Sequence, residues 1–290
     1  MAVAGTIGAL IPPSIILILY GVIAQVSITK LFLGGISAGI LTAIGYVIVV
    51  LVRVKLNPDL APSRDERHSM SEKLAALKDT WPILLVMIGI FGGLFSGVFT
   101  PTEAGAVGAF LACLVALVSG ELTLSRFFQA ARETTMTTAS LLIIAVGASL
   151  LTRFLALSGA GDYLSAGITS VASNSALLLI GIVVVYLLLG MFLEPIGAML
   201  LTLPIILPVI DAADWSLLWF GIILTKLLEI GMITPPIGMN VFVIKGVVGD
   251  LVKTSTIFRG VLWFVVMDLI IITLLSVFPE IILSLPQMFG

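Results

Sequence analysis

Eight long apolar runs, separated by short polar stretches, dominate the chain. They cover residues 2–28, 31–52, 82–99, 103–120, 134–157, 175–210, 215–244 and 260–285. A run of about 20 apolar residues is long enough to cross the hydrocarbon core of a bilayer as a helix. A single strongly charged stretch, 53–81, separates the second run from the third. The pattern therefore predicts an all-α polytopic membrane protein with one substantial loop outside the membrane.

The composition excludes most alternatives. The chain has 290 residues, of which 60% are hydrophobic and only 10% charged, whereas an average soluble domain has about 25% charged residues. So little charge cannot cover a water-facing surface, which excludes a soluble enzyme, a nucleic-acid-binding protein and a disordered scaffold. Cys113 is the only cysteine, and the only histidine, His68, lies in the charged stretch. We therefore expect no enzyme activity, no disulfide and no metal cluster.

The distribution of lysine and arginine predicts the topology. Cytoplasmic loops are enriched in these residues, so we place the 53–81 loop in the cytoplasm. Most other basic residues fall on the same side if 175–210 enters and leaves the membrane from outside as a re-entrant hairpin. Glu194-Pro195 interrupts this run, and each arm of about fifteen residues, roughly 22 Å of helix, is shorter than a hydrocarbon core of about 30 Å. The alternative is one long kinked span.

Two apolar runs share an unusual interruption. Pro12-Pro13 and Pro235-Pro236 each lie in the middle of a run and are flanked by glycine and by serine or threonine. Consecutive prolines leave backbone carbonyls without donors, and lipid cannot satisfy them. In the predicted topology the two broken helices run in opposite directions, so 1–52 would end a first inverted repeat and 82–290 would form the second. Such paired breaks are typical of substrate and ion sites in secondary transporters; simple kinks are the alternative.

Polar groups near these interruptions suggest a cation site. Ser14, Thr234 and Asn240 carry neutral oxygens beside the breaks, and a hard cation such as sodium prefers oxygen ligands. Glu194 could help to hold a cation or could cap the second arm of the hairpin. Thr202 could line the site or bond back to its own helix. A channel that uses the same breaks as a filter is the rival class, but an inverted repeat favours alternating access.

Other polar residues read as structural. Thr100 to Glu103 form a capping box that starts the helix 103–120, and 126–133 reads as a separate interfacial helix before 134–157. Lys226 and Glu229 are three residues apart and are expected to pair on one helix face. Asp268 is an isolated acid in the last run, and the sequence suggests no partner for it.

Four motifs together resemble the large membrane subunit of TRAP transporters, the DctM-like family. They are residues 5–14 (GTIGALIPPS), 99–104 (FTPTEA), 190–195 (GMFLEP) and 233–240 (ITPPIGMN). The resemblance extends in order and spacing from residue 1 to about 286. It implies a permease of the bacterial inner membrane that works with a periplasmic substrate-binding protein and a small four-helix membrane subunit. The imported organic anion would be a C4-dicarboxylate or sialic-acid-like molecule, carried by a sodium-coupled elevator motion.

The resemblance also implies where substrate and sodium bind. The hairpin 175–210 and the two broken helices would form the site, with sodium ions as coupling ions and no other cofactor. The candidate residues are Gly5, Thr6, Gly8, Pro12, Pro13, Ser14, Glu194, Pro195, Gly197, Thr202, Gly231, Thr234, Pro235, Pro236, Gly238 and Asn240.

Family members are longer at the N-terminus, where they carry scaffold helices and a first hairpin. We therefore expect this chain to be an N-terminally shortened form that does not transport by itself. A non-transporting membrane scaffold or remnant is the corresponding alternative.

Overall fold

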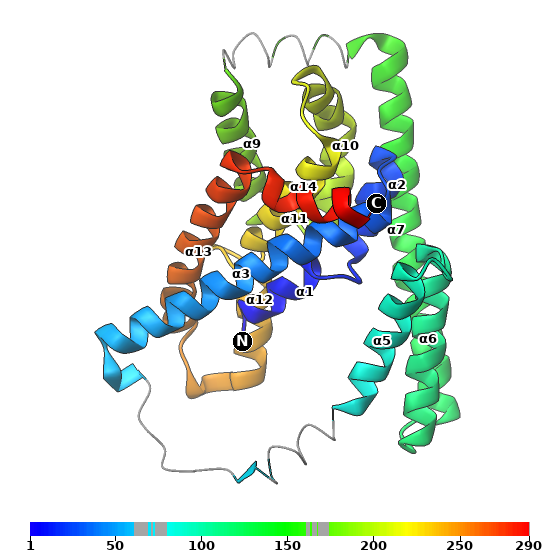
Figure 1. Cartoon of the computed structure of the whole chain (residues 1–290), viewed down its shortest axis with the longest axis vertical. Coiled ribbons are helices and arrows are strands. Elements are labelled where there is room, and N and C mark those ends of the chain that lie inside the picture. Colours follow the sequence, from blue (N-terminus) through cyan, green and yellow to red (C-terminus); the bar gives the residue numbers. More distant parts are fainter. Residues whose placement is uncertain are drawn as a thin grey trace. The chain divides into compact units, whose positions relative to one another are not determined.

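The computed structural model describes residues 1–60, 69, 70, 72, 80–160, 163, 167 and 174–289. Within these ranges the chain forms helices and no strands (Figure 1). Six helical segments of the described residues are long and apolar enough to cross a membrane. The prediction of an all-α polytopic membrane protein is thus confirmed. Most of the predicted charged loop, including His68, lies outside the described residues.

Packing divides the chain into two units. The first comprises Met1–Leu56 with Ile143–Gly290, and the second comprises Asn57–Leu142. This division follows contacts between helices and differs from the predicted division into sequence repeats.

The first broken helix forms as predicted in the first unit. Helix α1 (Ala4–Leu10) ends before Pro12-Pro13, and helix α2 (Ile15–Ala24) begins after them. Ser14 is the N-cap of α2, with its hydroxyl accepting a bond from the Leu17 N–H. Helix α3 (Ile28–Leu56) follows after a short turn and runs further toward the charged stretch than the predicted 31–52.

Two glycines of α3 allow the backbone at the first break to pack closely against this helix. A Cβ on Gly35 would lie 2.6 Å from the carbonyl oxygen of Leu10, and one on Gly39 would lie 2.5 Å from the Ile11 side chain. Small residues on one face let membrane helices pack backbone against backbone. The break between α1 and α2 is therefore held directly against α3.

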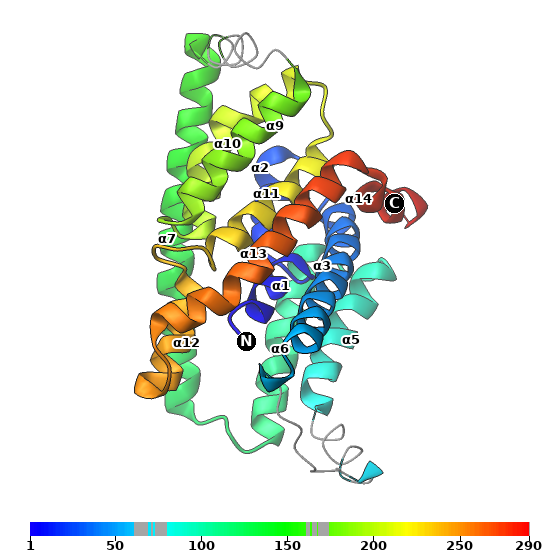
Figure 2. The same ribbon diagram turned by 90° about the vertical axis from the view of Figure 1, so that its left-hand side faces the viewer.

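The second broken helix also forms as predicted. Helix α11 (Leu217–Gly231) ends before Pro235-Pro236, and α12 (Met239–Val248) begins after Gly238. Helix α11 is buried along almost its whole length (Figure 2). It packs against α1, α2, α3, α9, α10, α13 and α14, so it is the central helix of the first unit.

The prediction of a single helix over 260–285 is wrong. A short η2 turn (Gly249–Leu251) leads to α13 (Thr254–Val277), and a separate α14 (Glu280–Phe289) follows. Pro279 has no N–H to donate to the carbonyl of Leu275, so the helix ends there. The indole N–H of Trp219 donates to this carbonyl instead, at 2.9 Å.

The run 175–210 folds into two helices joined by a short turn. Helix α9 (Ser175–Gly190) precedes the turn and α10 (Pro195–Ala212) follows it. The predicted interruption at Glu194-Pro195 is confirmed. Helix α10 has 18 residues, about 27 Å of helix, and is longer than the arm of about fifteen residues predicted from the sequence.

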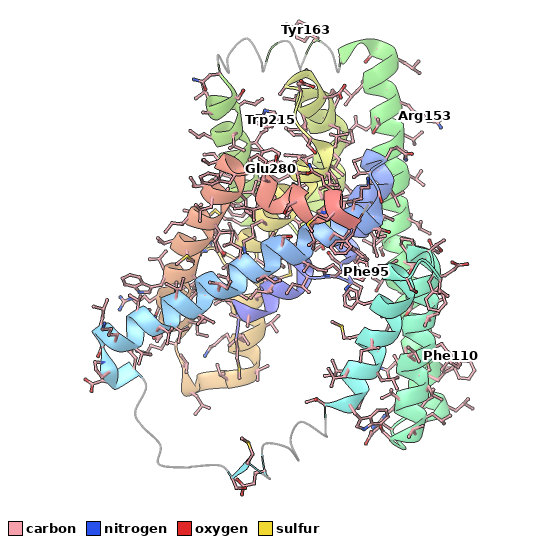
Figure 3. The ribbon with its side chains drawn as sticks, viewed as in Figure 1. Phe95, Phe110, Arg153, Tyr163, Trp215 and Glu280 are labelled. Carbon is pink, nitrogen blue, oxygen red and sulfur yellow. The ribbon has the colours of Figure 1, made fainter. Side chains whose placement is uncertain are left out.

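The second unit contains a helix pair and the start of a third helix. After η1 (Pro58–Leu60), helix α5 (Trp81–Phe95) packs against α6 (Pro101–Val118). The predicted capping box is confirmed, because Thr100 accepts from the Glu103 N–H and the Glu103 carboxylate accepts from the Thr100 N–H. Phe110 of α6 is 66% exposed and points outward (Figure 3), as expected of a side chain that faces lipid.

The separate interfacial helix predicted over 126–133 does not form. A single helix α7 (Leu124–Ser158) includes this stretch and the predicted 134–157 helix. No glycine or proline occurs between Glu121 and Val146, so nothing in the backbone interrupts the helix at the change from polar to apolar residues.

Candidate functional site

The first helix break removes two backbone donors. In an uninterrupted helix, residues 12 and 13 would donate to the carbonyls of Gly8 and Ala9, but both are prolines. The Ser14 hydroxyl donates to the Ala9 carbonyl and so replaces one of these donors. Gly8 is exposed, and a Cβ placed on it would meet no atom within 4 Å. The carbonyl of this exposed residue therefore lacks its helical donor.

The second break is built differently. Here the prolines remove the donors to the carbonyls of Gly231 and Met232. The Thr234 N–H donates to the Gly231 carbonyl at 3.2 Å, and the Asn240 N–H donates to the Met232 carbonyl at 3.0 Å. Gly238 has a φ of +56° and serves as the N-cap of α12. The turn thus replaces the lost helical bonds with bonds from Thr234 and Asn240, two of the predicted site residues.

The second break lies against the beginning of α1, the helix that leads to the first break. The Asn240 side chain, from the start of α12, donates through Nδ2 to the carbonyl of Ala2 at 3.3 Å. A Cβ on Gly5 would lie 3.7 Å from the same nitrogen. Helix α1 also packs directly on α11. Gly5 and Asn240, which are far apart in the sequence, are therefore neighbours, as the predicted site requires.

Three predicted hydroxyls bond to backbone carbonyls beside the breaks. Thr6 donates to the Val3 carbonyl at 2.8 Å, Thr234 donates to the Ile230 carbonyl at 2.6 Å, and Ser14 bonds as described above. A hydroxyl oxygen that donates one bond keeps acceptor lone pairs. These oxygens and the carbonyls of the breaks are neutral ligands of the kind that a hard monovalent cation prefers.

The predicted hairpin residues have structural partners. Glu194 is the N-cap of α10, and its carboxylate accepts from the N–H groups of Ile196 and Gly197 at 3.0 and 2.8 Å. Thr202 donates to the Ala198 carbonyl at 2.8 Å and lies 2.6 Å from the Tyr186 hydroxyl. The capping and back-bonding interpretations are therefore confirmed for these two side chains. Pro195 occupies the first position of α10.

A pair of glycines joins the hairpin to the second break. A Cβ added to Gly231 would lie 2.5 Å from the Cα of Gly190, and the two backbones touch where α9 and α11 end. Gly231 thus serves as a packing contact between α9 and α11. This contact, and not direct binding, is the role that the structure gives to Gly231. Gly190 is not among the residues predicted for the site, although it begins the motif 190–195 (GMFLEP).

A buried charged group adjoins this region, and sequence reasoning found only half of it. Lys226 and Glu229 pair as predicted, with Nζ 3.2 Å from Oε2. Asp268, for which the sequence suggested no partner, lies 2.9 Å from the same Nζ. Tyr46 of α3 donates to the other carboxylate oxygen of Asp268 at 2.8 Å. An isolated acid in one apolar helix and a lysine in another were the available signal, since such groups pair inside membranes.

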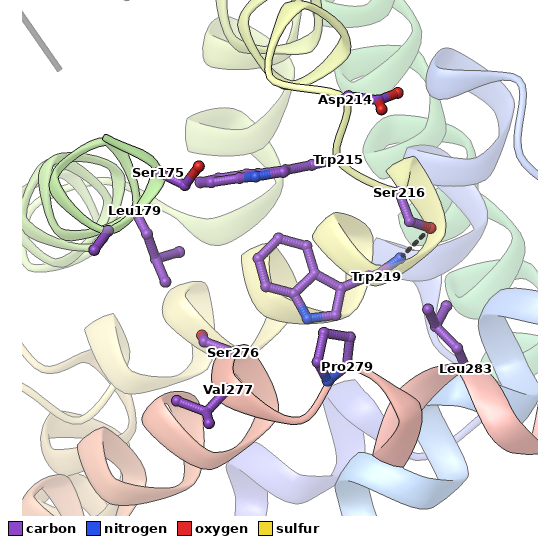
Figure 4. Close-up of a pocket in the computed structure, with 11 residues that line it drawn as sticks. Ser175, Leu179, Asp214, Trp215, Ser216, Trp219, Ser276, Val277, Pro279 and Leu283 are labelled. Carbon is purple, nitrogen blue, oxygen red and sulfur yellow. Dashed lines mark hydrogen bonds between the residues drawn. The ribbon is translucent and has the colours of Figure 1, made fainter. Parts of the chain in front are cut away.

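The cavity at the other end of α11 contains none of the predicted site residues. It measures about 430 Å³ and is lined by Trp215 and Trp219, by Ser175 of α9 and by residues at the junction of α13 and α14 (Figure 4). The two tryptophan rings meet edge to face with centroids 5.5 Å apart. The two tryptophans lie at the beginning of α11, and tryptophan is enriched where membrane helices meet the membrane surface.

Together these features define a polytopic membrane protein with two broken helices packed against each other and a helical hairpin that touches the second break. Among the described residues there is no group of three or more His, Cys, Asp or Glu that could hold a metal. Residues 1–281 match the family "Tripartite ATP-independent periplasmic transporter, DctM component". The chain belongs to this family, whose members are transporter subunits and not enzymes.

Similar proteins support this assignment. The chain is 34% identical over 284 residues to the sialic acid TRAP transporter large permease protein SiaM of Vibrio cholerae, covering 98% of this chain and 65% of that protein. It is 34% identical over 291 residues to the C4-dicarboxylate TRAP transporter large permease protein DctM of Pseudomonas aeruginosa, covering 99% and 66%. The chain therefore spans about two thirds of the length of these relatives.

Proposed function

We propose that this chain forms the site-bearing part of the large permease subunit of a tripartite transporter that imports an organic anion together with sodium. The observation that carries the proposal is the contact between the second helix break and the beginning of α1, the first broken helix, at Asn240, Ala2 and Gly5. Unwound backbone is costly in lipid unless a ligand or polar partner satisfies it. Paired discontinuous helices that meet inside a membrane protein are the usual frame of such a site.

Sodium is the coupling ion that the local chemistry favours. The break region offers backbone carbonyls and hydroxyls, and these ligands hold a hard cation without any titratable group. The Gly8 carbonyl, without its helical donor, and the hydroxyls of Thr6 and Thr234 are the ligands that we assign to it. An elevator movement of the hairpin and broken helices would then carry the ion and the anion together.

The names of the relatives suggest the substrate class and the partners. One relative is named for sialic acid and another for C4-dicarboxylates, both of which are carboxylated anions. We propose a carboxylate substrate, delivered by a periplasmic binding protein and carried across the bacterial inner membrane by this subunit with a small membrane subunit.

The test is uptake of radiolabelled sialic acid and succinate by proteoliposomes that contain the permease subunits, with the binding protein outside. We expect uptake that requires an inward sodium gradient and saturates with binding protein. Thr234→Val removes a proposed sodium ligand and should raise the half-saturating sodium concentration about tenfold, the equivalent of one hydrogen bond of about 1.4 kcal/mol.

Thr225→Val is the matched control. Thr225 is fully buried in the same helix as the second break and donates only to its own Gly221 carbonyl, at 2.8 Å. Its replacement should leave the sodium dependence unchanged. Uptake that does not depend on the sodium gradient would contradict sodium coupling. A sodium current without saturable uptake would favour a channel.

A further inference from the structure

The charged group at the centre of the first unit joins three helices. Lys226 comes from α11, Asp268 from α13 and Tyr46 from α3. The side chains of Lys226 and Glu229 are 0% exposed, and that of Asp268 is 1% exposed. The ammonium also lies 5.5 Å from the centre of the Tyr46 ring. The side chain of Thr6, from α1, lies beside the Tyr46 hydroxyl, so the group extends to the first broken helix.

The charges in this group do not balance. One ammonium faces two carboxylates, and both of its contacts are ion pairs, at 2.9 Å to Asp268 and 3.2 Å to Glu229. Tyr46 adds a hydrogen bond to Asp268 only. The second carboxylate oxygen of Glu229, Oε1, is buried and has no hydrogen-bond partner among the described residues. A buried charge without compensation is strongly unfavourable.

The location of Glu229 makes the imbalance larger. It lies in the last turn of α11, which ends at Gly231, and the C-terminal end of a helix carries partial negative charge. A second carboxylate charge at this end is therefore repelled by the helix as well as by Asp268. Something positive is needed at Oε1.

The neighbouring helices do not supply it within the described residues. The Tyr20 hydroxyl of α2 donates to the Leu217 carbonyl at the opposite end of α11, and the Tyr186 hydroxyl of α9 is bonded to Thr202. Lys245 of α12 binds the carbonyls of Gly249 and Val252. The remaining charged residues of α3, α10, α13 and α14 lie toward the ends of those helices or outside the buried core, at Lys30, Arg53, Lys55, Asp211, Arg259 and Glu280.

We propose that Glu229 binds one monovalent cation, a proton or a sodium ion, at Oε1 within the buried group that it forms with Lys226 and Asp268. The bound charge makes the group neutral, with two positive and two negative charges or with one ion pair beside a neutral acid. This site is distinct from the carbonyls and hydroxyls of the breaks, and its test does not depend on transport.

The test uses purified protein in detergent and three forms of it: the unsubstituted chain, Glu229→Gln and Glu280→Gln. The last is the matched control, because it makes the same chemical change at an exposed position of α14. The unfolding temperature is measured against sodium, with choline as the replacement ion, and against pH. Infrared spectra record the C=O band of a protonated carboxylic acid.

Each cation has its own signature. If only the folded protein binds a proton at Glu229, the folded state holds more protons than the unfolded state, and stability rises as pH falls. The carboxylic acid band is then present in the unsubstituted chain and in Glu280→Gln but lost in Glu229→Gln. If sodium binds, the carboxylic acid band is absent, and added sodium raises the unfolding temperature of the unsubstituted chain and of Glu280→Gln. The rise is smaller in Glu229→Gln, which lacks this site.

One result overturns the proposal. If Glu229→Gln has the same sodium dependence, pH dependence and infrared spectrum as the unsubstituted chain, Glu229 binds neither cation. Should Glu229→Gln fail to fold, Glu229→Met replaces it, because an apolar side chain leaves Lys226 and Asp268 as a balanced ion pair. The same losses are then expected, and the same absence of change contradicts the proposal.

Discussion

Substitution of Gly231 by alanine tests whether the contact between the hairpin and the second break is as close as the structure shows. The added Cβ would lie 2.5, 2.6 and 2.7 Å from the Cα, carbonyl carbon and carbonyl oxygen of Gly190. Ordinary contact begins near 3.4 Å, so the two helices must separate by roughly 1 Å. Because all three atoms belong to the backbone, no side-chain rotation can relieve the clash.

Two opposing effects determine the size of the change. Overpacking of a tight contact typically costs about 1–3 kcal/mol. Alanine in a helix interior is about 1 kcal/mol more favourable than glycine, but Gly231 is the last residue of α11, so only part of this gain applies. We therefore expect Gly231→Ala to lower the free energy of unfolding by about 1–2 kcal/mol. Sodium-dependent uptake should fall as well, because the helices separate at Gly231, whose carbonyl accepts the Thr234 N–H bond of the second break.

Gly181→Ala is the matched control. Gly181 lies in α9, the same helix as Gly190, and a Cβ there would meet no atom within 4 Å. Only the propensity effect remains, so this variant should be more stable by up to about 1 kcal/mol. The free energies are measured by SDS titration in mixed micelles. If both variants change stability equally and in the same direction, the close contact between α9 and α11 is refuted.

Three further predictions concern other parts of the first unit. Gly238→Ala should cost about 1–2 kcal/mol in the same SDS titration, because Gly238 has a positive φ and an added Cβ would lie 2.8 Å from the Phe258 ring. Gly246→Ala should not be destabilising, because a Cβ on Gly246, in the helix that Gly238 caps, would meet no atom within 4 Å. Glu194→Gln should leave the half-saturating sodium concentration unchanged in the uptake assay, because the carboxylate caps α10 and an amide oxygen can still accept one of the two bonds; a large increase would assign Glu194 to the cation site. Trp219→Phe should cost about 1–3 kcal/mol of unfolding free energy, because it leaves the Leu275 carbonyl, which Pro279 cannot reach with an N–H, without a donor. Trp215→Phe should change stability little, and equal effects of the two substitutions would contradict this role of the indole N–H.

The sequence predicted features that depend on local chemistry. A Pro-Pro pair inside an apolar run must interrupt a helix wherever the run is placed, so both breaks appear where expected. The capping box at Thr100 and Glu103 is equally local. The missed end of α13 had a local signal in Pro279, but α10 continues through Pro204 and Pro208, so a single proline does not decide where a helix ends. The sequence did not predict the continuous α7, because the change from polar to apolar residues near 133 was interpreted as the end of one helix and the start of another.

Features that depend on the packing of distant helices were not predictable in the same way. Tyr46 and Asp268 are separated by 222 positions, and nothing in the periodicity of α3 marks Tyr46 as the partner of an acid in α13. The glycine contact at Gly190 and Gly231 depends on the crossing of α9 and α11 at their ends. A single sequence contains the residue types for such contacts but does not contain the pairing.

The end of α11 combines three properties that a mobile binding site requires. Gly231 provides the closest backbone contact with the hairpin, its carbonyl is the first to lose its helical donor, and Glu229 lies one half-turn earlier in the buried charged group. A movement of the hairpin that separates Gly190 from Gly231 would therefore also change the surroundings of the break and of Glu229. If Glu229 binds a cation as proposed and its affinity depends on the hairpin position, occupancy of Glu229 must shift the hairpin equilibrium by the same factor.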